Sequence, residues 1–241
     1  MHRFAAFSGG NDSTAMVLRM AEIGEDFSLL FTPAGRELPE VFRHVANIKR
    51  LTGKPLVQPE GPSLVDLIDK YDAIPNWQQR WCTKYIKIKP CQKYLLQFED
   101  VQLCVGLRAD EDERPGGKYY EVDYRTPLRE WGWTLRDVKD YLYTNNVEVP
   151  VRTDCDCCFG QRLSEWYELW QTHPKRFQWA EDLEAEKGHT WRSAQRDTWP
   201  AALKDLRAEF ERGKIPRGAY EKIQLDLFDC PKMQRCRICS M

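Results

Sequence analysis

The sequence lacks both a long apolar run and a marked excess of either charge. No stretch approaches the roughly 18 consecutive apolar residues of a transmembrane helix, so we expect no membrane partner. The first residues, MHRFAAFSGG, hold no cationic stretch followed by an apolar core, which predicts a cytoplasmic chain without a signal peptide. Lys and Arg number 36 against 37 Asp and Glu, and the net charge of −1 argues against binding nucleic acid through overall charge.

Internal repeats, low-complexity linkers and paired histidines are also lacking. The four histidines do not have the spacing of metal ligands: His2, His44, His173 and His189. Apolar and aromatic residues are abundant, at 42% and 12%, which predicts a packed core rather than a disordered chain. Nine cysteines are present, and in a reducing compartment clustered cysteines bind metal or carry out redox chemistry more often than they form disulfides.

Strand-like and helix-like segments alternate over residues 1–110. Apolar runs predict strands at residues 3–8, 27–32, 55–59 and 101–106. Helical patterns cover residues 13–23, 37–51, 63–71 and, with an interruption at Pro90, 77–98. This alternation predicts an α/β fold with a parallel, doubly wound five-stranded sheet flanked by helices.

The composition changes after residue 160. Five of the nine tryptophans lie in a charged, helix-prone stretch: Trp166, Trp170, Trp179, Trp191 and Trp199. We therefore predict two domains, a sheet domain over residues 1–160 and a helical extension over residues 161–241 with a cysteine-rich tail. The tryptophans are interpreted as core residues of that extension, or as a lid over the site.

The stretch SGGNDST, residues 8–14, stands where the first expected strand passes into the first expected helix. Gly9 and Gly10 permit a tight turn, and Asp12 to Thr14 open the helix. Backbone N–H groups and the positive end of the helix dipole converge there, which favours phosphate binding. The alternative is an ordinary strand-to-helix turn with a serine cap, because the spacing matches neither the Walker A nor the dinucleotide pattern.

The same residues resemble S-G-G-x-D-S, the pyrophosphate loop of the adenine nucleotide alpha-hydrolase-like superfamily. Three further stretches resemble, in the right order, segments of phosphoadenosine phosphosulfate (PAPS) reductases: TPAGRELPE at 32–40, RWCTKYIKIKP at 80–90 and VGLRADEDER at 105–114. The resemblance covers roughly residues 4–160 and implies an adenine-nucleotide site across the ends of the first, second and fourth strands. The residues it points to for the nucleotide are Ser8, Gly9, Gly10, Asn11, Asp12, Ser13, Thr14, Gly35, Arg80, Lys84, Lys87, Arg108 and Arg114.

One of these segments is also unusual in its charge. Residues 73–98 hold no acidic side chain but several basic ones: Arg80, Lys84, Lys87, Lys89 and Lys93. Such a run suits a sulfate or phosphate group, and the alternative is a solvated basic helix face. Arg80 and Lys84, four residues apart, are expected to share a helical face.

Cys155, Cys157 and Cys158 fall in the motif DCDCCF. A C-x-x-C pair can hold a metal or a cluster from a single loop. The iron–sulfur members of the resembling family, the adenylyl-sulfate reductases, add a Cys-Cys pair where this chain has Trp81-Cys82, so one ligand is missing. The candidate ligands of a 4Fe-4S cluster are Cys82, Cys155, Cys157 and Cys158. Alternatives are Cys91 as the fourth ligand, three ligands with an open iron, zinc in place of iron, and unligated thiols.

The C-terminal segment CPKMQRCRICSM holds Cys230, Cys236 and Cys239. These three cysteines are either a small metal site or structural thiols. PAPS reductases carry a nucleophilic cysteine close to the C-terminus, and the resemblance implies that role for Cys239, although the surrounding residues do not match.

Three functions are compatible with these patterns. In the first, ATP adenylates an acceptor with loss of pyrophosphate, with Mg²⁺ near Asp12 as part of the catalytic apparatus, and a sulfur donor completes sulfur transfer. In the second, Cys239 reduces PAPS or adenylyl sulfate to sulfite with a thioredoxin-like reductant. In the third, the chain is a non-catalytic nucleotide-binding regulatory module. The acceptor in the first function is open and includes nucleic acid.

Overall fold

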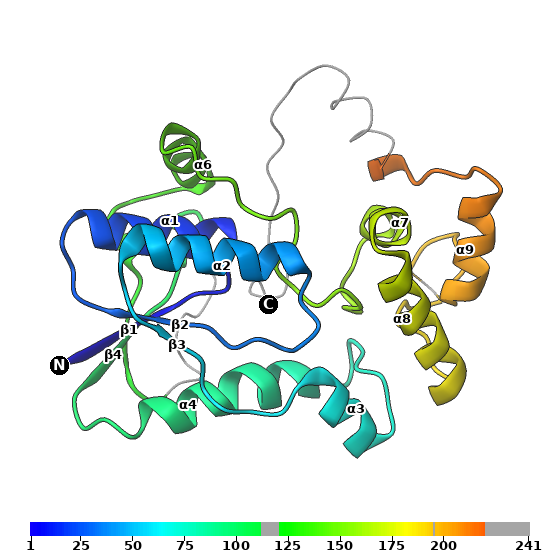
Figure 1. Cartoon of the computed structure of the whole chain (residues 1–241), viewed down its shortest axis with the longest axis horizontal. Coiled ribbons are helices and arrows are strands. Elements are labelled where there is room, and N and C mark those ends of the chain that lie inside the picture. Colours follow the sequence, from blue (N-terminus) through cyan, green and yellow to red (C-terminus); the bar gives the residue numbers. More distant parts are fainter. Residues whose placement is uncertain (112–120, 195, 220–241) are drawn as a thin grey trace. The chain divides into compact units, whose positions relative to one another are not determined.

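The computed structural model describes residues 1–111, 121–194 and 196–219 (Figure 1). Within these residues the chain forms two compact units. The sheet unit comprises residues 1–63 and 83–154, and the helical unit comprises residues 64–82 and 155–219. The structure groups residues 64–82 with the C-terminal helices, and the predicted division into domains at residue 160 stays a prediction.

The sheet unit contains five parallel strands in the order β3-β2-β1-β4-β5. The strands are β1 (His2–Ala6), β2 (Ser28–Leu30), β3 (Leu56–Val57), β4 (Val101–Cys104) and β5 (Asp123–Arg125). This arrangement confirms the predicted α/β fold with a parallel sheet. The fifth strand had no sequence signal of its own, because its three residues, DYR, are polar and at least partly exposed.

Alternate residues of the central strands pack on opposite faces of the sheet. Ala5, Leu29 and Cys104 belong to one core cluster, which also contains buried residues of α1 (Asn11–Glu22), α2 (Pro39–Thr52), α5 (Pro127–Glu130) and α6 (Leu135–Thr144). Phe4, Leu30 and Leu103 form a second cluster with residues of α4 (Lys89–Leu95). Figure 1 shows α1 and α2 on one side of the sheet and α4 on the other. The sheet is therefore covered on both faces, as its apolar strands predict.

The expected helix over residues 77–98 is shorter and combines two helical geometries. A π-helical segment, η1 (Thr83–Ile88), continues directly into α4, in which Pro90 is the second residue and lacks the N–H that would bond the preceding turn. Arg80 precedes these helical residues. The expectation that Arg80 and Lys84 share a helical face is therefore wrong.

The helical unit contains α3 (Leu64–Tyr71), α7 (Leu163–Thr172), α8 (Pro174–Lys187) and α9 (Leu203–Glu211). Trp166 and Trp191 are buried in it, which agrees with the interpretation of these two as core residues. The Trp166 ring contacts Phe177 edge to face at 6.1 Å, and the Trp191 indole N–H donates to the Ala180 carbonyl at 3.0 Å. Among the described residues, no helix is both long and apolar enough to cross a bilayer.

Candidate functional site

The loop between β1 and α1 is shaped by two glycines and two serines. Gly9 has φ +79°, a conformation that favours glycine, and Gly10 is extended where α1 begins. The Ser13 hydroxyl accepts the Ser8 N–H at 3.3 Å and donates to the Gly10 carbonyl at 3.1 Å, while the two serine hydroxyls lie 3.2 Å apart. These bonds close the loop over the first turn of α1, the part of a helix whose N–H groups bind anions.

A buried histidine hydrogen-bonds the first turn of α1. The Thr14 hydroxyl lies 3.0 Å from His44 Nε2, and a backbone hydrogen bond joins His44 to Glu148. Burial lowers the pKa of His44 to about 4, so its imidazole is neutral near pH 7 and can accept from Thr14. The sequence places His44 on the apolar face of α2, and this spacing is the signal that predicts a buried histidine rather than a metal ligand.

The segment after β4 approaches the start of α1 closely. A Cβ atom on Gly106 would lie 3.2 Å from the Ser13 backbone nitrogen and 3.3 Å from the Asp12 carbonyl carbon. Only glycine allows this approach without displacing the helix. The close approach brings Arg108, two residues further on, to the side chain of Asp12.

Arg108 and three carboxylates form a compact charged group. The Arg108 guanidinium lies 2.6 Å from Asp12, 2.8 Å from Asp110 and 3.6 Å from Glu111. Burial raises the pKa of Asp12 to about 6, against the opposing effect of Arg108. Asp12 Oδ1 is buried and has no hydrogen-bond partner among the residues that the structure describes.

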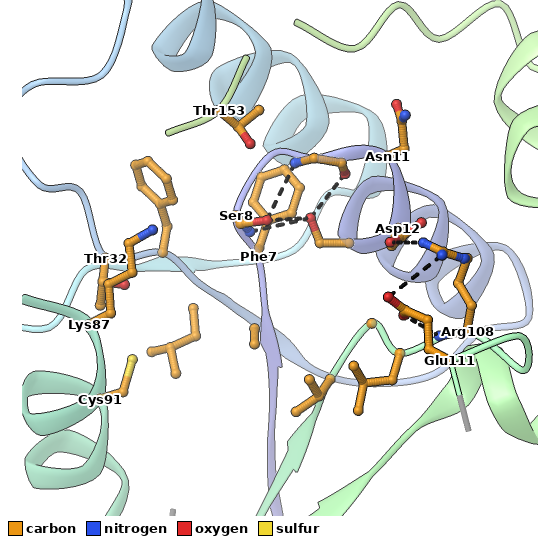
Figure 2. A pocket seen from close by; sticks show the side chains of 18 of the residues that line it. Phe7, Ser8, Asn11, Asp12, Thr32, Lys87, Cys91, Arg108, Glu111 and Thr153 are labelled. Carbon is orange, nitrogen blue, oxygen red and sulfur yellow. Dashed lines mark hydrogen bonds and ion pairs between the residues drawn. The ribbon is translucent and has the colours of Figure 1, made fainter. Parts of the chain in front are cut away.

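These features border one cavity of about 440 Å³ at the carboxyl ends of β1, β2 and β4 (Figure 2). Parallel sheets bind their ligands at this edge, and the volume is in the range of small-molecule sites. Seven of the residues predicted from sequence line it: Ser8, Gly10, Asn11, Asp12, Ser13, Lys87 and Arg108. Gly9 lies in the turn before α1, and Thr14 lies in the first turn of α1.

The other residues predicted for the nucleotide lie elsewhere. Lys84 is exposed on η1, and Arg80 belongs to the helical unit. Gly35 is exposed with φ +80°, and its N–H donates to Glu37 at 3.0 Å. Arg114, Cys230, Cys236 and Cys239 lie outside the described residues.

Glu37, Thr32, Cys91 and Thr153 also line the cavity and were not predicted as nucleotide ligands. Glu37 is buried and accepts the Ala34 N–H at 2.6 Å, so it orders the chain that follows β2. Thr32 hydrogen-bonds the Cys91 thiol, and burial raises the pKa of that thiol to about 11. Their position after β2 signalled Glu37 and Thr32, whereas nothing local in the sequence signalled Thr153.

The cysteines predicted as metal ligands lie in the helical unit. Cys155 and Cys158 form a turn in which the Cys158 N–H donates to the Cys155 carbonyl at 3.1 Å, and Cys157 is fully buried. Among the described residues, no three His, Cys, Asp or Glu side chains are grouped as for a metal ion. The structure therefore does not bring Cys82, Cys155, Cys157 and Cys158 together as a ligand set, and a 4Fe-4S or zinc site there stays a prediction.

The chain is similar to several known proteins. It is 25% identical over 189 residues to an uncharacterized protein of Methanocaldococcus jannaschii, in a match that covers 70% of this chain and 38% of that protein. The chain thus spans about two fifths of this curated relative's length.

Solved structures with similarity include the PAPS reductase from Candida auris in a phosphate complex, with 16% identity, a TM-score of 0.49 and coverage of 62% of this chain and 75% of that one. The U34-tRNA thiolase NcsA from Methanococcus maripaludis, with its 4Fe-4S cluster, has 12% identity and a TM-score of 0.47, with coverage of 90% and 82%.

A family model, described as the phosphoadenosine phosphosulfate reductase domain, matches residues 2–151. The match runs from β1 through β5 and includes the glycine–serine loop, Gly106 and Arg108. Because it spans more than half of the 241 residues, this chain belongs to the phosphoadenosine phosphosulfate reductase domain family.

Proposed function

We propose that this protein binds ATP as its magnesium complex and transfers the adenylyl group to an oxygen of an acceptor, releasing pyrophosphate. The acceptor oxygen bonds to the α-phosphorus, and the bond from that phosphorus to pyrophosphate breaks with its electron pair. A sulfur nucleophile from a sulfur donor then displaces AMP from the activated acceptor. In this scheme the chain positions the phosphates and balances their charge.

The observation that carries the proposal is the acidic lining of the cavity. Four carboxylates and two cations line it: Asp12, Glu37, Asp110 and Glu111, with Lys87 and Arg108. A polyphosphate entering alone would meet an excess of like charge. One or two carboxylates together with phosphate oxygens are, however, a usual ligand set for Mg²⁺. The lining therefore suits a nucleotide that arrives with a divalent cation.

Asp12 is the residue best suited to that cation. One of its oxygens, Oδ2, is held by Arg108, while Oδ1 is buried and unpartnered among the described residues. A carboxylate oxygen can only accept, so a cation or a donor must satisfy it. The N-terminus of α1, which carries Asp12, supplies backbone N–H groups to the phosphates at the same place. Oδ1 and these amides together fit a metal–phosphate complex better than either ion alone.

Calorimetric titration of the whole chain tests this proposal with three ligands: ATP with Mg²⁺, ATP with EDTA, and PAPS. We expect MgATP to bind at least about tenfold more tightly than ATP in EDTA, and Asp12→Asn to remove this difference. Addition of the correct acceptor should then release pyrophosphate. Binding of PAPS without a magnesium requirement, together with sulfite release in the presence of thioredoxin, would support the reductase and overturn the proposal.

A further inference from the structure

Thr153 is a buried residue beside the cavity, and its hydroxyl group makes no hydrogen bond within the described part of the chain. The residue is 6% exposed, and its Oγ1 has no hydrogen-bond partner among the residues that the structure describes. An unpaired buried hydroxyl is unfavourable, and native proteins satisfy nearly all such groups. Thr153 also lines the cavity, so a ligand in the cavity can supply the missing partner.

The packing of the Thr153 methyl group sets the position of this hydroxyl. Thr153 Cγ2 lies 3.7 Å from the place where a Cβ on Gly9 would stand. With the methyl group facing Gly9, the hydroxyl leaves the same carbon in another direction. Figure 2 shows Thr153 beside the loop that carries Ser8, and away from Arg108 and Glu111. In the same view (Figure 2), the hydroxyl oxygen of Thr153 is drawn on the side of that loop, at the phosphate-loop side of the cavity.

The two other threonines of the site already have partners within the protein. The Thr14 hydroxyl bonds His44, and the Thr32 hydroxyl bonds the Cys91 thiol. The neighbouring N-terminus of α1 presents N–H donors and a positive dipole end, which favour an anion. A ligand oxygen that accepts from these amides can accept from the Thr153 hydroxyl as well.

We propose that Thr153 donates a hydrogen bond to the pyrophosphate portion of the bound nucleotide. This inference rests on the proposed function and adds a ligand from the chain after α6, far in sequence from the glycine–serine loop. The pyrophosphate is then held between the N-terminus of α1 and Thr153. With a contact to the pyrophosphate portion, Thr153 should strengthen the binding of a di- or triphosphate more than that of a monophosphate.

The test compares Thr153→Val with Thr153→Ser, which keep the shape and the hydroxyl, respectively. Affinities are measured by calorimetry, with Mg²⁺ present, for inorganic pyrophosphate, for an ATP analogue with a methylene bridge between the α and β phosphorus, and for AMP. We expect Thr153→Val to weaken the first two by about tenfold or more and AMP by less than about twofold. Thr153→Ser should bind pyrophosphate within about threefold of the parent chain.

Thermal unfolding of the ligand-free chain gives an independent readout. Because Thr153→Val removes an unpaired buried hydroxyl, the melting temperature should stay level or rise, by up to about 2–4 °C. Thr52→Val is the matched control, since the Thr52 hydroxyl already donates to the Ile48 carbonyl at 2.8 Å, away from the cavity. That variant should leave all three affinities unchanged.

The outcomes separate this inference from the proposed function. If the parent chain binds MgATP and Thr153→Val binds pyrophosphate equally well, the role of Thr153 is overturned while the function stands. Equal weakening of pyrophosphate and AMP also overturns it, because the hydroxyl would then act on another part of the ligand. If the parent chain binds neither MgATP nor pyrophosphate, the proposed function itself fails.

Discussion

Arg108 and Asp12 meet at 2.6 Å although 96 residues separate them in the sequence. Asp12 stands in the first turn of α1, and Arg108 follows β4, the strand next to β1 in the sheet. Their contact holds one carboxylate oxygen of Asp12, while the second is buried without a hydrogen-bond partner among the described residues. The contact places one positive and one negative side chain beside the uncharged glycine–serine loop.

Replacing Arg108 by methionine should destabilise the protein and impair nucleotide binding together. The change removes the cation that pairs Asp12 and one of the partners of Glu111, and breaking buried ion pairs costs up to about 5 kcal/mol. Asp110 is more exposed, so the loss of its ion pair costs less than the loss of a buried one. We therefore expect the free energy of unfolding, measured with urea at pH 7, to fall by about 2–4 kcal/mol. Arg108→Lys keeps the charge without the planar fork and should recover part of the loss. Equal stability of all three proteins would contradict this account of the charged group.

Gly106→Ala should weaken nucleotide binding through the backbone. Its Cβ would stand 3.2 Å from the Ser13 nitrogen, so the first turn of α1 must shift. Overpacking of this kind costs about 1–3 kcal/mol. Gly24→Ala is a matched control: Gly24 has φ +78° with nothing near its Cβ position, so strain costs about 1–2 kcal/mol there without moving the loop. We expect both variants to lower the melting temperature and only Gly106→Ala to weaken MgATP binding in calorimetry.

The sequence allows the sheet and the loop to be predicted because their signals are local. Apolar strands alternate with helices, and SGGNDS occupies consecutive positions after the first strand. The tertiary contacts of the other site residues cannot be found in this way. Glu37 accepts two backbone N–H groups after β2, and His44 hydrogen-bonds Thr14 on another helix. Thr153 lines a cavity together with Asp12, which lies more than a hundred residues earlier in the sequence.

The same reasoning explains the two structural surprises. Arg80 lies just before the helical residues, and helix boundaries are poorly marked in a sequence, so the expected face shared by Arg80 and Lys84 was wrong. The strand β5 is polar and three residues long, and its place is set by pairing with β4 rather than by its own composition.

We expect the Glu37 carboxylate to hold the backbone of the segment that follows β2 in place. Its buried carboxylate accepts the N–H groups of Ala34 at 2.6 Å and Gly35 at 3.0 Å. In Glu37→Gln, the amide NH₂ would face one of these donors, which leaves a buried N–H unpaired and costs about 1–3 kcal/mol. Amide hydrogen exchange at Ala34 and Gly35 should accelerate in this variant, while exchange in α6 stays unchanged. Unaltered protection at these two amides would show that the carboxylate does not order the segment.

Asp12 and His44 should influence stability in opposite directions over the same pH range. The folded pKa of Asp12, about 6, lies above its ordinary 3.8, so ionisation between these values lowers the free energy of unfolding as pH rises. The folded pKa of His44, about 4, lies below its ordinary 6.5, so the unfolded chain gains its proton first and stability falls as pH drops. Each shift corresponds to about 3 kcal/mol, and in the parent protein the two largely offset each other.

Single substitutions should separate these two contributions. Between pH 7 and pH 4, the free energy of unfolding of Asp12→Asn should fall by up to about 3 kcal/mol relative to that of the parent. The variant lacks the stabilisation from protonating Asp12, while protonation of His44 in the unfolded chain still lowers its stability. His44→Gln keeps an acceptor for Thr14 but cannot titrate, so it should gain a similar amount over the same range. Urea titrations at half-unit pH intervals measure both differences, in which all other titrating groups cancel. Two flat differences, or two of the same sign, would mean that neither side chain is buried beside the loop as described, since burial is what drives both pKa shifts.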